Sequence, residues 1–186
     1  MTPIRNRVPR CRRAVTLVVI LWLASALAVA QLRDERAVRA AYVFNLTKYI
    51  EWPVAGNELV IGFEGDRPTG EVFQKLIDGR TVDSRQIRVV LFPSDEELEK
   101  CHVVYLTDVE EKKTRNLLGK LGTRSVLTVG ESPNFLRAGG VVGLVNSGDQ
   151  IQIQVNVDAA QRAGIRISSR LLNLAVIVRE RQVGGN

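Results

Sequence analysis

The chain has 186 residues, 45% of them hydrophobic and 25% charged, with 26 basic and 20 acidic side chains and a net charge of +6. The excess charge belongs to the first thirty residues, which carry five arginines and no acid, so residues 31–186 have 21 basic against 20 acidic side chains. A balance this close to neutral gives no reason to expect nucleic-acid binding, and a single histidine excludes a metal site with two histidine ligands.

Residues 1–30 are predicted to be a signal peptide. The arginines form a basic region, the apolar run Ala14–Leu27 follows, and Ala28 and Ala30 supply a small-x-small cleavage pattern. The alternative is an uncleaved anchor, but this run is shorter than the about 20 apolar residues that a spanning helix needs. We therefore expect export with cleavage after Ala30, one domain over residues 31–183, and a frayed tail at 184–186.

The stretch Val38–Pro53 is predicted to be a helix that lies on a sheet. Six residues recur at helical spacing on one face: Val38, Ala41, Tyr42, Leu46, Tyr49 and Ile50. Pro53 disfavours helical geometry at Trp52, so the helix is expected to end there. Asn45 falls among the apolar positions, and two interpretations stay open. Asn45 is either a satisfied amide in the core, or an edge, together with Trp52, of a binding groove.

Strands alternate with helices through the rest of the chain. The predicted strands are Asn57–Phe63, Gln86–Phe92, Cys101–Leu106, Ser125–Val129, Val141–Val145 and Ile151–Val157. The predicted helices are Thr69–Asp78, Asp95–Lys100 capped by Ser94, Asp108–Lys120, Glu131–Gly140, Asp158–Ala163 capped by Asp158, and a last helix from Ser168 or Ser169 through Val178. This order predicts an α/β fold, with a mainly parallel sheet, helices on both faces and a late antiparallel hairpin.

The strand Ile151–Val157 alternates isoleucine and valine with amide side chains. Such a strand buries one face and leaves the other wet, as edge or antiparallel strands often do.

No catalytic constellation emerges from these residues. Cys101 and His102 are adjacent in a predicted strand, so their side chains point to opposite faces and cannot form a nucleophile–base pair. Cys101 is the one cysteine after residue 30 and is expected to be a free thiol, either an ordinary core residue or a redox site. We expect neither an enzyme nor a cofactor or metal site.

Several motifs resemble the YfiR/HmsC-like family of bacterial periplasmic proteins. They are AAYVFNLTKYIEWP over Ala40–Pro53, CHVVY at Cys101–Tyr105, LTV at Leu127–Val129 with Phe135 and Gly139-Gly140, and Gln154–Ala175. The resemblance implies a periplasmic α/β domain without known catalytic residues. It also implies repression of an inner-membrane diguanylate cyclase, and sequestration of the repressor by an outer-membrane lipoprotein. Some relatives have cysteines that pair, whereas Cys101 has no partner in the expected mature chain.

The expected function is therefore regulation of cyclic di-GMP signalling by protein–protein contact, with a sensor protein of the diguanylate cyclase type as partner. A lipoprotein is a second candidate partner, a homodimer stays open, and a small-ligand-binding domain is the alternative. The last helix is the expected partner surface, because its apolar residues span more than one sheet-facing stripe. The candidate contact residues are Arg170, Leu171, Asn173, Leu174 and Arg179. The competing interpretation is that a neighbouring loop covers the second side of this helix.

Overall fold

An eight-stranded sheet organises the chain from Ala37 onward, where one compact unit begins. The computed structural model describes residues 35–52, 56–148 and 150–180, so the proposed leader, its cleavage site at Ala28 and Ala30, and the tail at 184–186 lie outside the described residues. Across the sheet the strands are β10 (Val176–Val178), β8 (Gln150–Asn156), β7 (Val142–Ser147), β6 (Leu127–Gly130), β5 (Val103–Leu106), β2 (Glu58–Glu64), β4 (Arg85–Leu91) and β3 (Thr81–Val82).

The centre of the sheet is parallel, as predicted. Strands β4, β2, β5, β6 and β7 run side by side in one direction. β8 returns antiparallel along β7, which confirms the predicted hairpin, and β3 pairs antiparallel with β4. A separate two-stranded sheet joins β1 (Ile50–Glu51) to β9 (Arg166–Ile167).

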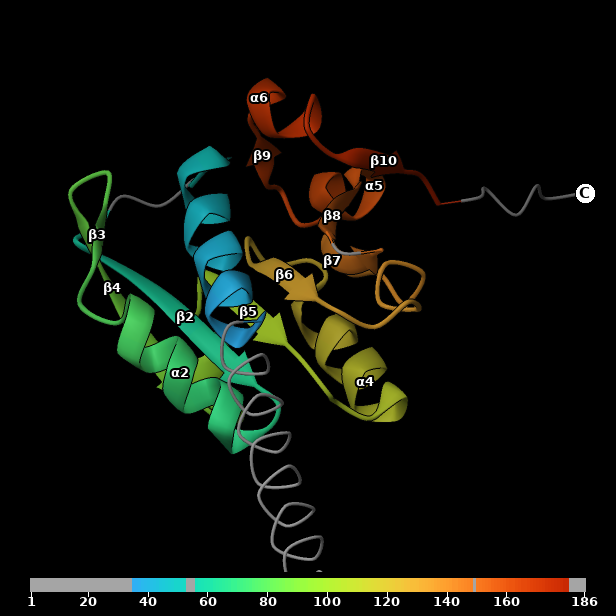
Figure 1. Ribbon diagram of the computed structural model, residues 1–186. Helices are drawn as coiled ribbons and strands as arrows, with labels where there is room; N and C mark the ends of the chain where they lie inside the picture. The colour runs from blue at the N-terminus through green and yellow to red at the C-terminus, as the bar shows by residue number, and fades with distance from the viewer. Residues whose placement is uncertain (1–34, 53–55, 149, 181–186) are drawn as a thin grey trace, which may run out of the picture. The chain divides into compact units, whose positions relative to one another are not determined.

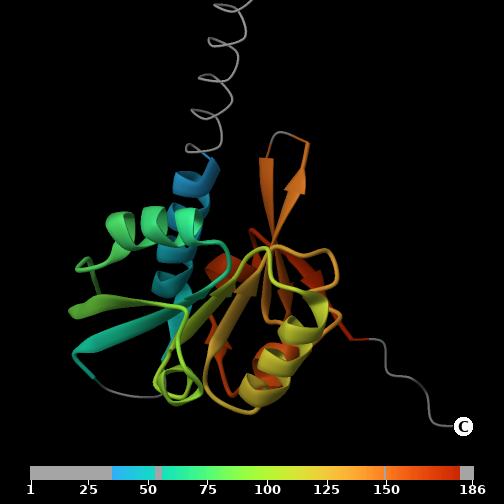
Figure 2. The same ribbon diagram turned by 90° about the horizontal axis from the view of Figure 1, so that it is seen from below.

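Helices cover both faces of the sheet, which confirms the predicted layering (Figures 1 and 2). On one face lie the first described helix (residues 35–46), α2 (Arg67–Ile77) and α5 (Val157–Arg162). The other face is covered by α3 (Asp95–Leu98) and α4 (Glu111–Leu121). The strands serve both layers because alternate side chains point to opposite faces. In β2, Ile61 belongs to the first core cluster and Val60 to the second.

One of the two predicted helix caps is present in the structure, and the other is not. Ser94 caps α3, as predicted, and Glu97 completes a reciprocal capping box with it. The prediction that Asp158 caps the next helix is wrong, because Asn156 accepts from the backbone N–H of Ala159 at 2.9 Å. β8 leads into α5 without a loop, so its last residue is the one that turns into the cap position.

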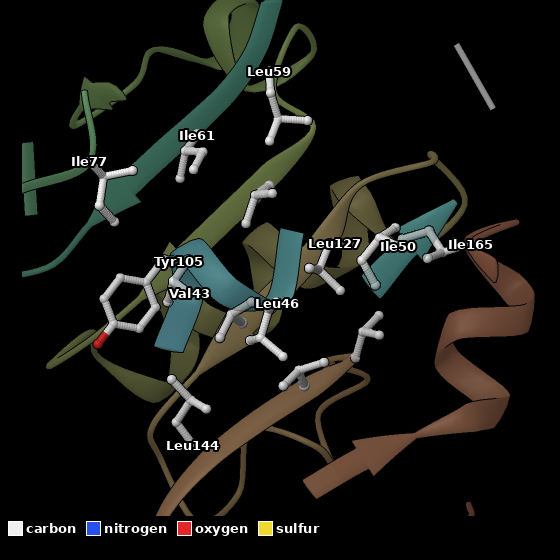
Figure 3. Close-up of a cluster of buried hydrophobic side chains, with 14 of the residues drawn as sticks. Val43, Leu46, Ile50, Leu59, Ile61, Ile77, Tyr105, Leu127, Leu144 and Ile165 are labelled. Carbon is white, nitrogen blue, oxygen red and sulfur yellow. The ribbon is translucent and has the colours of Figure 1, made fainter. Parts of the chain in front are cut away.

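The first helix is shorter than predicted, and its buried face differs. It ends at residue 46, the 3-10 turn η1 (Thr47–Tyr49) follows, and Ile50 is extended and pairs with Ile167. Val38 is 41% exposed, and the face toward the sheet carries Val43 and Leu46, whose side chains enter the core cluster drawn in Figure 3. Strand pairing of Ile50 therefore overrides the helical periodicity of the last predicted turn.

The predicted C-terminal helix is wrong over most of its length. Only α6 (Ser169–Leu172) is helical, and Val176–Val178 forms β10, parallel to β8. β-Branched residues suit a strand, and pairing here satisfies the backbone groups of β8 that would otherwise lie at the edge of the sheet. β8 is thus antiparallel, as predicted, but it is not an edge strand.

The predicted helix over Glu131–Gly140 is also wrong, because this segment makes successive turns. The turns wrap around the buried ring of Phe135. A Cβ atom on Gly140 would lie 2.1 Å from that ring, and one on Gly130 would lie 2.3 Å from it. The two glycines are therefore required for the backbone to close around the aromatic ring.

Candidate functional site

The carboxyl edge of the parallel strands is where α/β sheets usually bind ligands. The five parallel strands have the order β4-β2-β5-β6-β7, so the connections from β2 and β5 leave in opposite directions. At this point the loops after β2 and β5 touch. A Cβ atom on Gly65 would lie 2.4 Å from the carbonyl oxygen of Thr107, and the Thr107 N–H donates to Glu64 O at 3.0 Å. The usual crevice between these two strand ends is closed.

Polar side chains beside this closed crevice bind one another. Arg39 lies 3.1 Å from Glu131 through Nη1 and donates through Nη2 to Asn146 Oδ1 at 2.8 Å. The buried Tyr105 hydroxyl also donates to Glu131. We call Arg39, Tyr105, Glu131 and Asn146 the carboxyl-edge network. Arg39 lies in the first helix, Tyr105 in β5, Glu131 in the turn that follows β6, and Asn146 in β7. The network therefore connects four segments of the chain.

Two further features of this edge are a neighbouring ion pair and a cavity. Glu64 accepts from Lys113 Nζ at 2.6 Å. The cavity, of about 410 Å³, opens next to Thr107, Asp108 and Glu131. Glu131 is already engaged by Arg39 and Tyr105, so the network is a structural element rather than a vacant binding site.

A second cavity, of about 380 Å³, lies at the opposite, amino edge of the sheet. We call it the Trp52 pocket, and its lining residues are Lys48, Tyr49, Ile50, Glu51, Trp52, Leu59, Val82, Asp83, Arg85 and Ser168. A backbone hydrogen bond and a hairpin turn position several of these residues. The Ser168 N–H donates to Tyr49 O at 2.8 Å beside the β1–β9 pair, and Asp83 and Ser84 turn the β3–β4 hairpin with φ of 48° and 65°. Three parts of the chain that are distant in sequence meet here, namely residues 48–59, 82–85 and 168.

Two residues that line this pocket each carry a buried side-chain nitrogen without a hydrogen-bond acceptor among the described residues. Trp52 Nε1 and Arg85 Nη1 are shielded from solvent and have no hydrogen-bond acceptor among the described residues. Both groups can only donate hydrogen bonds. An unsatisfied buried donor carries a desolvation penalty, so native structures leave few of them. This pocket therefore differs chemically from the carboxyl-edge network.

His102 borders the indole of Trp52. The two rings are 6.0 Å apart and edge-on. His102 Nδ1 accepts from the Val60 N–H at 3.1 Å, so this nitrogen is unprotonated. Burial first, and then the charge of Arg85, lower the pKa of His102 below its usual 6.5, while Glu58 opposes this shift. The histidine is neutral near pH 7 and packs against the indole as an aromatic ring.

The predicted groove residues separate in the structure. Trp52 lines the pocket, whereas Asn45 is exposed and accepts from Lys48 Nζ at 3.0 Å. The interpretation of Asn45 as a buried core amide is wrong, because the helix presents Leu46 and Val43 to the sheet instead. Asp83 and Arg85 were not predicted, since they lie at a turn that carries no motif, and Ser168 was predicted only as a possible start of the last helix.

The structure exposes four of the five predicted partner-contact residues and buries the fifth. Leu171 is 1% exposed and belongs to the core, so its assignment as a contact residue is wrong. Arg170, Asn173 and Arg179 are exposed, and Leu174 is 73% exposed. Val176 and Ile177 of β10 are also exposed. We call Leu174, Val176 and Ile177 the C-terminal surface.

Cys101 is buried and chemically quiet. Its thiol donates to Glu97 O at 3.3 Å, and burial raises its pKa to about 11. At neutral pH the sulfur is therefore a thiol rather than the reactive thiolate.

Within the ranges that the structure describes, no three His, Cys, Asp or Glu side chains are grouped so that they could hold a metal ion. Over the same ranges, no helix is both long and apolar enough to cross a membrane.

A sequence model of a known protein family matches most of this chain. The sequence model of a family described as YfiR/HmsC-like matches residues 36–176. The matched range runs from the first helix to β10, so it includes the carboxyl-edge network and the lining residues of the Trp52 pocket.

Proposed function

The chain belongs to the YfiR/HmsC-like family, and from this membership we propose that it is a periplasmic repressor of an inner-membrane diguanylate cyclase that acts by direct protein contact. The family regulates cyclic di-GMP signalling in bacteria, is periplasmic in general, and is regulatory rather than catalytic. Export through cleavage after Ala30 is part of this proposal, and N-terminal sequencing of the native protein tests it. A mature chain that still begins near Met1 would contradict it.

The observation that supports a contact mechanism is the C-terminal surface. Leu174, Val176 and Ile177 are apolar and exposed at the end of the sheet, and Val176 and Ile177 lie on opposite faces of β10. β10 is the last strand in the sheet order, so its outer edge is unpaired among the described residues. Such an edge can accept a strand or an apolar segment from a partner. The exposed residues Arg170, Asn173 and Arg179 are the proposed polar rim of this surface.

The mechanism is a population shift in the cyclase. A repressor that binds the inactive state of the sensor domain more tightly than the active state holds the enzyme off, without any chemistry of its own. An outer-membrane lipoprotein that binds the repressor then releases the cyclase, and a homodimer through the same edge would compete with both partners.

A genetic experiment tests this function. Deleting the gene should raise cyclic di-GMP and matrix production, and the intact gene should restore repression. Leu174→Asp should fail to restore it although the protein folds, since charged residues on an exposed site leave stability within about 0.5 kcal/mol. The matched control is Leu76→Asp, which alters an exposed leucine of α2 near the other end of the sheet and should restore repression.

The possible results separate the function from its site. Unchanged cyclic di-GMP in the deletion strain, with every diguanylate cyclase present, contradicts the regulatory role. Normal repression by a folded Leu174→Asp protein removes only the assignment of the C-terminal surface. Recovery of the cyclase with the repressor from solubilised membranes, and its loss with Leu174→Asp, would connect the two.

A further inference from the structure

We propose that Glu180 is a positioning residue that clamps the end of β10 to α5 and β8, and so holds the C-terminal surface in the form that a partner binds. The inference rests on the proposed function, because it concerns the proposed partner surface. It adds to that function a residue that lies outside the surface and acts through the strand that carries it.

The strand that carries the C-terminal surface buries little apolar area. β10 has three residues, and Val176 and Ile177 are 44% and 41% exposed. Leu174, just before the strand, is 73% exposed, and only Val178 packs as a partly buried residue against the second core cluster. Segments with few buried apolar contacts open locally at low free-energy cost. Apolar packing alone therefore holds β10 only weakly on the sheet.

Two anchors flank this exposed stretch. On the upstream side, Leu171 of α6 is buried in the core. On the downstream side, the Glu180 carboxylate accepts from both terminal nitrogens of Arg162, from Nη1 at 2.6 Å through Oε2 and from Nη2 at 2.6 Å through Oε1. Two parallel bonds between a guanidinium and a carboxylate are among the strongest side-chain hydrogen bonds and fix the relative orientation of both groups. Glu180 therefore ties the end of β10 to α5.

Two further hydrogen bonds connect Glu180 to the residues where β8 passes into α5. Asn156 Nδ2 donates to Glu180 Oε1 at 3.1 Å, and the Glu180 N–H donates to Asp158 Oδ2 at 2.8 Å. Asn156 is fully buried, also donates to Leu136 O at 3.1 Å, and lies opposite Val178 in the pairing of β8 with β10. Removing the Glu180 carboxylate would leave a buried N–H of Asn156 without this acceptor, which is unfavourable.

The exposure of the ion pair limits the size of the effect. The side chains of Arg162 and Glu180 are 48% and 38% exposed, so water and salt weaken their attraction. We therefore expect the clamp to control the local opening of β10 rather than the stability of the whole domain.

Hydrogen exchange of the full chain, measured by mass spectrometry, tests the clamp. Glu180→Gln should raise the exchange rate of the amides in residues 174–180 about fivefold, and Arg162→Gln should do the same. Exchange in β2 and β5 should not change in either variant. The double variant should exchange no faster than the single ones, because both substitutions remove the same interaction.

The matched control is Arg124→Gln. Arg124 is 45% exposed and donates to Glu99 at 2.8 Å, so the same substitution breaks a similarly exposed ion pair elsewhere on the domain. Exchange in residues 174–180 should change less than twofold in this variant. In the deletion strain, Glu180→Gln should repress cyclic di-GMP less than Arg124→Gln when both proteins are present at equal levels.

The outcomes separate the clamp from the proposed function. Unchanged exchange in Glu180→Gln, multiplied effects in the double variant, or an equal effect of Arg124→Gln would overturn the clamp. Faster exchange together with full repression would overturn its role in positioning the partner surface. Unchanged cyclic di-GMP in the deletion strain itself would contradict the regulatory function instead, and the exchange rates of the purified protein would still decide whether Glu180 holds β10.

Discussion

Polar side chains at the two edges of the parallel sheet differ in whether they find hydrogen-bond partners. At the carboxyl edge Arg39, Tyr105, Glu131 and Asn146 satisfy one another, and Gly65 and Thr107 close the crevice between β2 and β5. At the amino edge Trp52 and Arg85 each keep a buried donor without an acceptor among the described residues. The edge that α/β folds commonly give to ligands is here a structural joint.

The first helix connects these two environments. Arg39 near its beginning lies in the carboxyl-edge network, and Trp52, shortly after its end, lines the pocket at the amino edge. In Figure 2 the outer parts of β7 and β8, drawn in orange, extend beyond the sheet, and Asn146 of β7 accepts from Arg39 of this helix. Anchoring this helix through Arg39 at the carboxyl edge therefore also helps to position Trp52 at the amino edge.

Arg39→Met gives the largest expected change, because it breaks the centre of the carboxyl-edge network. The free energy of unfolding should fall by about 3 kcal/mol, since removing one member of a largely buried ion pair leaves the other uncompensated. Urea denaturation measures the change. Arg124→Met breaks the exposed pair with Glu99 and should lower the free energy of unfolding by less than about 1 kcal/mol. Equal effects of the two variants would show that the network is not a structural joint.

A comparison of one polar group at each edge sharpens the contrast. Tyr105→Phe removes a hydroxyl that donates to Glu131 and should destabilise the protein by about 2 kcal/mol, as for a hydrogen bond to a charged group. Arg85→Met removes a donor that has no acceptor, so the free energy of unfolding should stay within about 0.5 kcal/mol or rise. Thermal and urea unfolding of both variants decide this. A loss with Arg85→Met as large as that with Tyr105→Phe would mean that Arg85 is satisfied in the free protein.

The smallest expected effect is a pH dependence from His102 at the amino edge. Its pKa in the folded protein is lowered below 6.5, so the unfolded chain binds the proton first and stability falls as the pH drops below about 6.5. Protonation of Nδ1 would also remove the acceptor for the Val60 N–H. His102→Asn, which keeps an acceptor but does not titrate, should flatten the profile between pH 7.5 and 5.5.

Carboxylates with lowered pKa values act in a different range. The pKa values of Glu97, beside Ser94, and of Glu180, beside Arg162, lie below 4.5, so their contributions to stability are lost only at lower pH. A slope between pH 7.5 and 5.5 that is unchanged in His102→Asn would therefore assign the titration to another group.

Much of the sheet could be predicted from local patterns. β2 and β5 are nearly continuous apolar runs, which fits strands buried on both faces, and the alternation of isoleucine with glutamine marks β8. The cap by Ser94 could be predicted because a cap residue and the N–H group it binds lie within four residues. In each case the residues that decide the structure are close together in the sequence.

The sequence predictions are wrong where pairing or packing with a segment distant in the sequence determines the local structure. Val176–Val178 is apolar enough for a helix or a strand, and pairing with β8 selects the strand. Ile50 continues a helical pattern but pairs with Ile167 instead. Trp52, a possible groove edge in one of the two interpretations, lines a pocket, whereas Asn45 is exposed. The exact rotation of a helix on a sheet depends on packing that periodicity resolves only coarsely.

The sequence by itself thus determined the α/β class, the core strands, the hairpin and the family motifs, because these depend on short-range periodicity and on residue order. Only the tertiary structure decided which polar groups are satisfied. Arg39 and Arg85 are both arginines near apolar residues, yet one meets Glu131 and Asn146 and the other meets no acceptor among the described residues. Satisfaction of a buried donor depends on atoms brought from remote segments, and their positions follow from how the helices and strands pack.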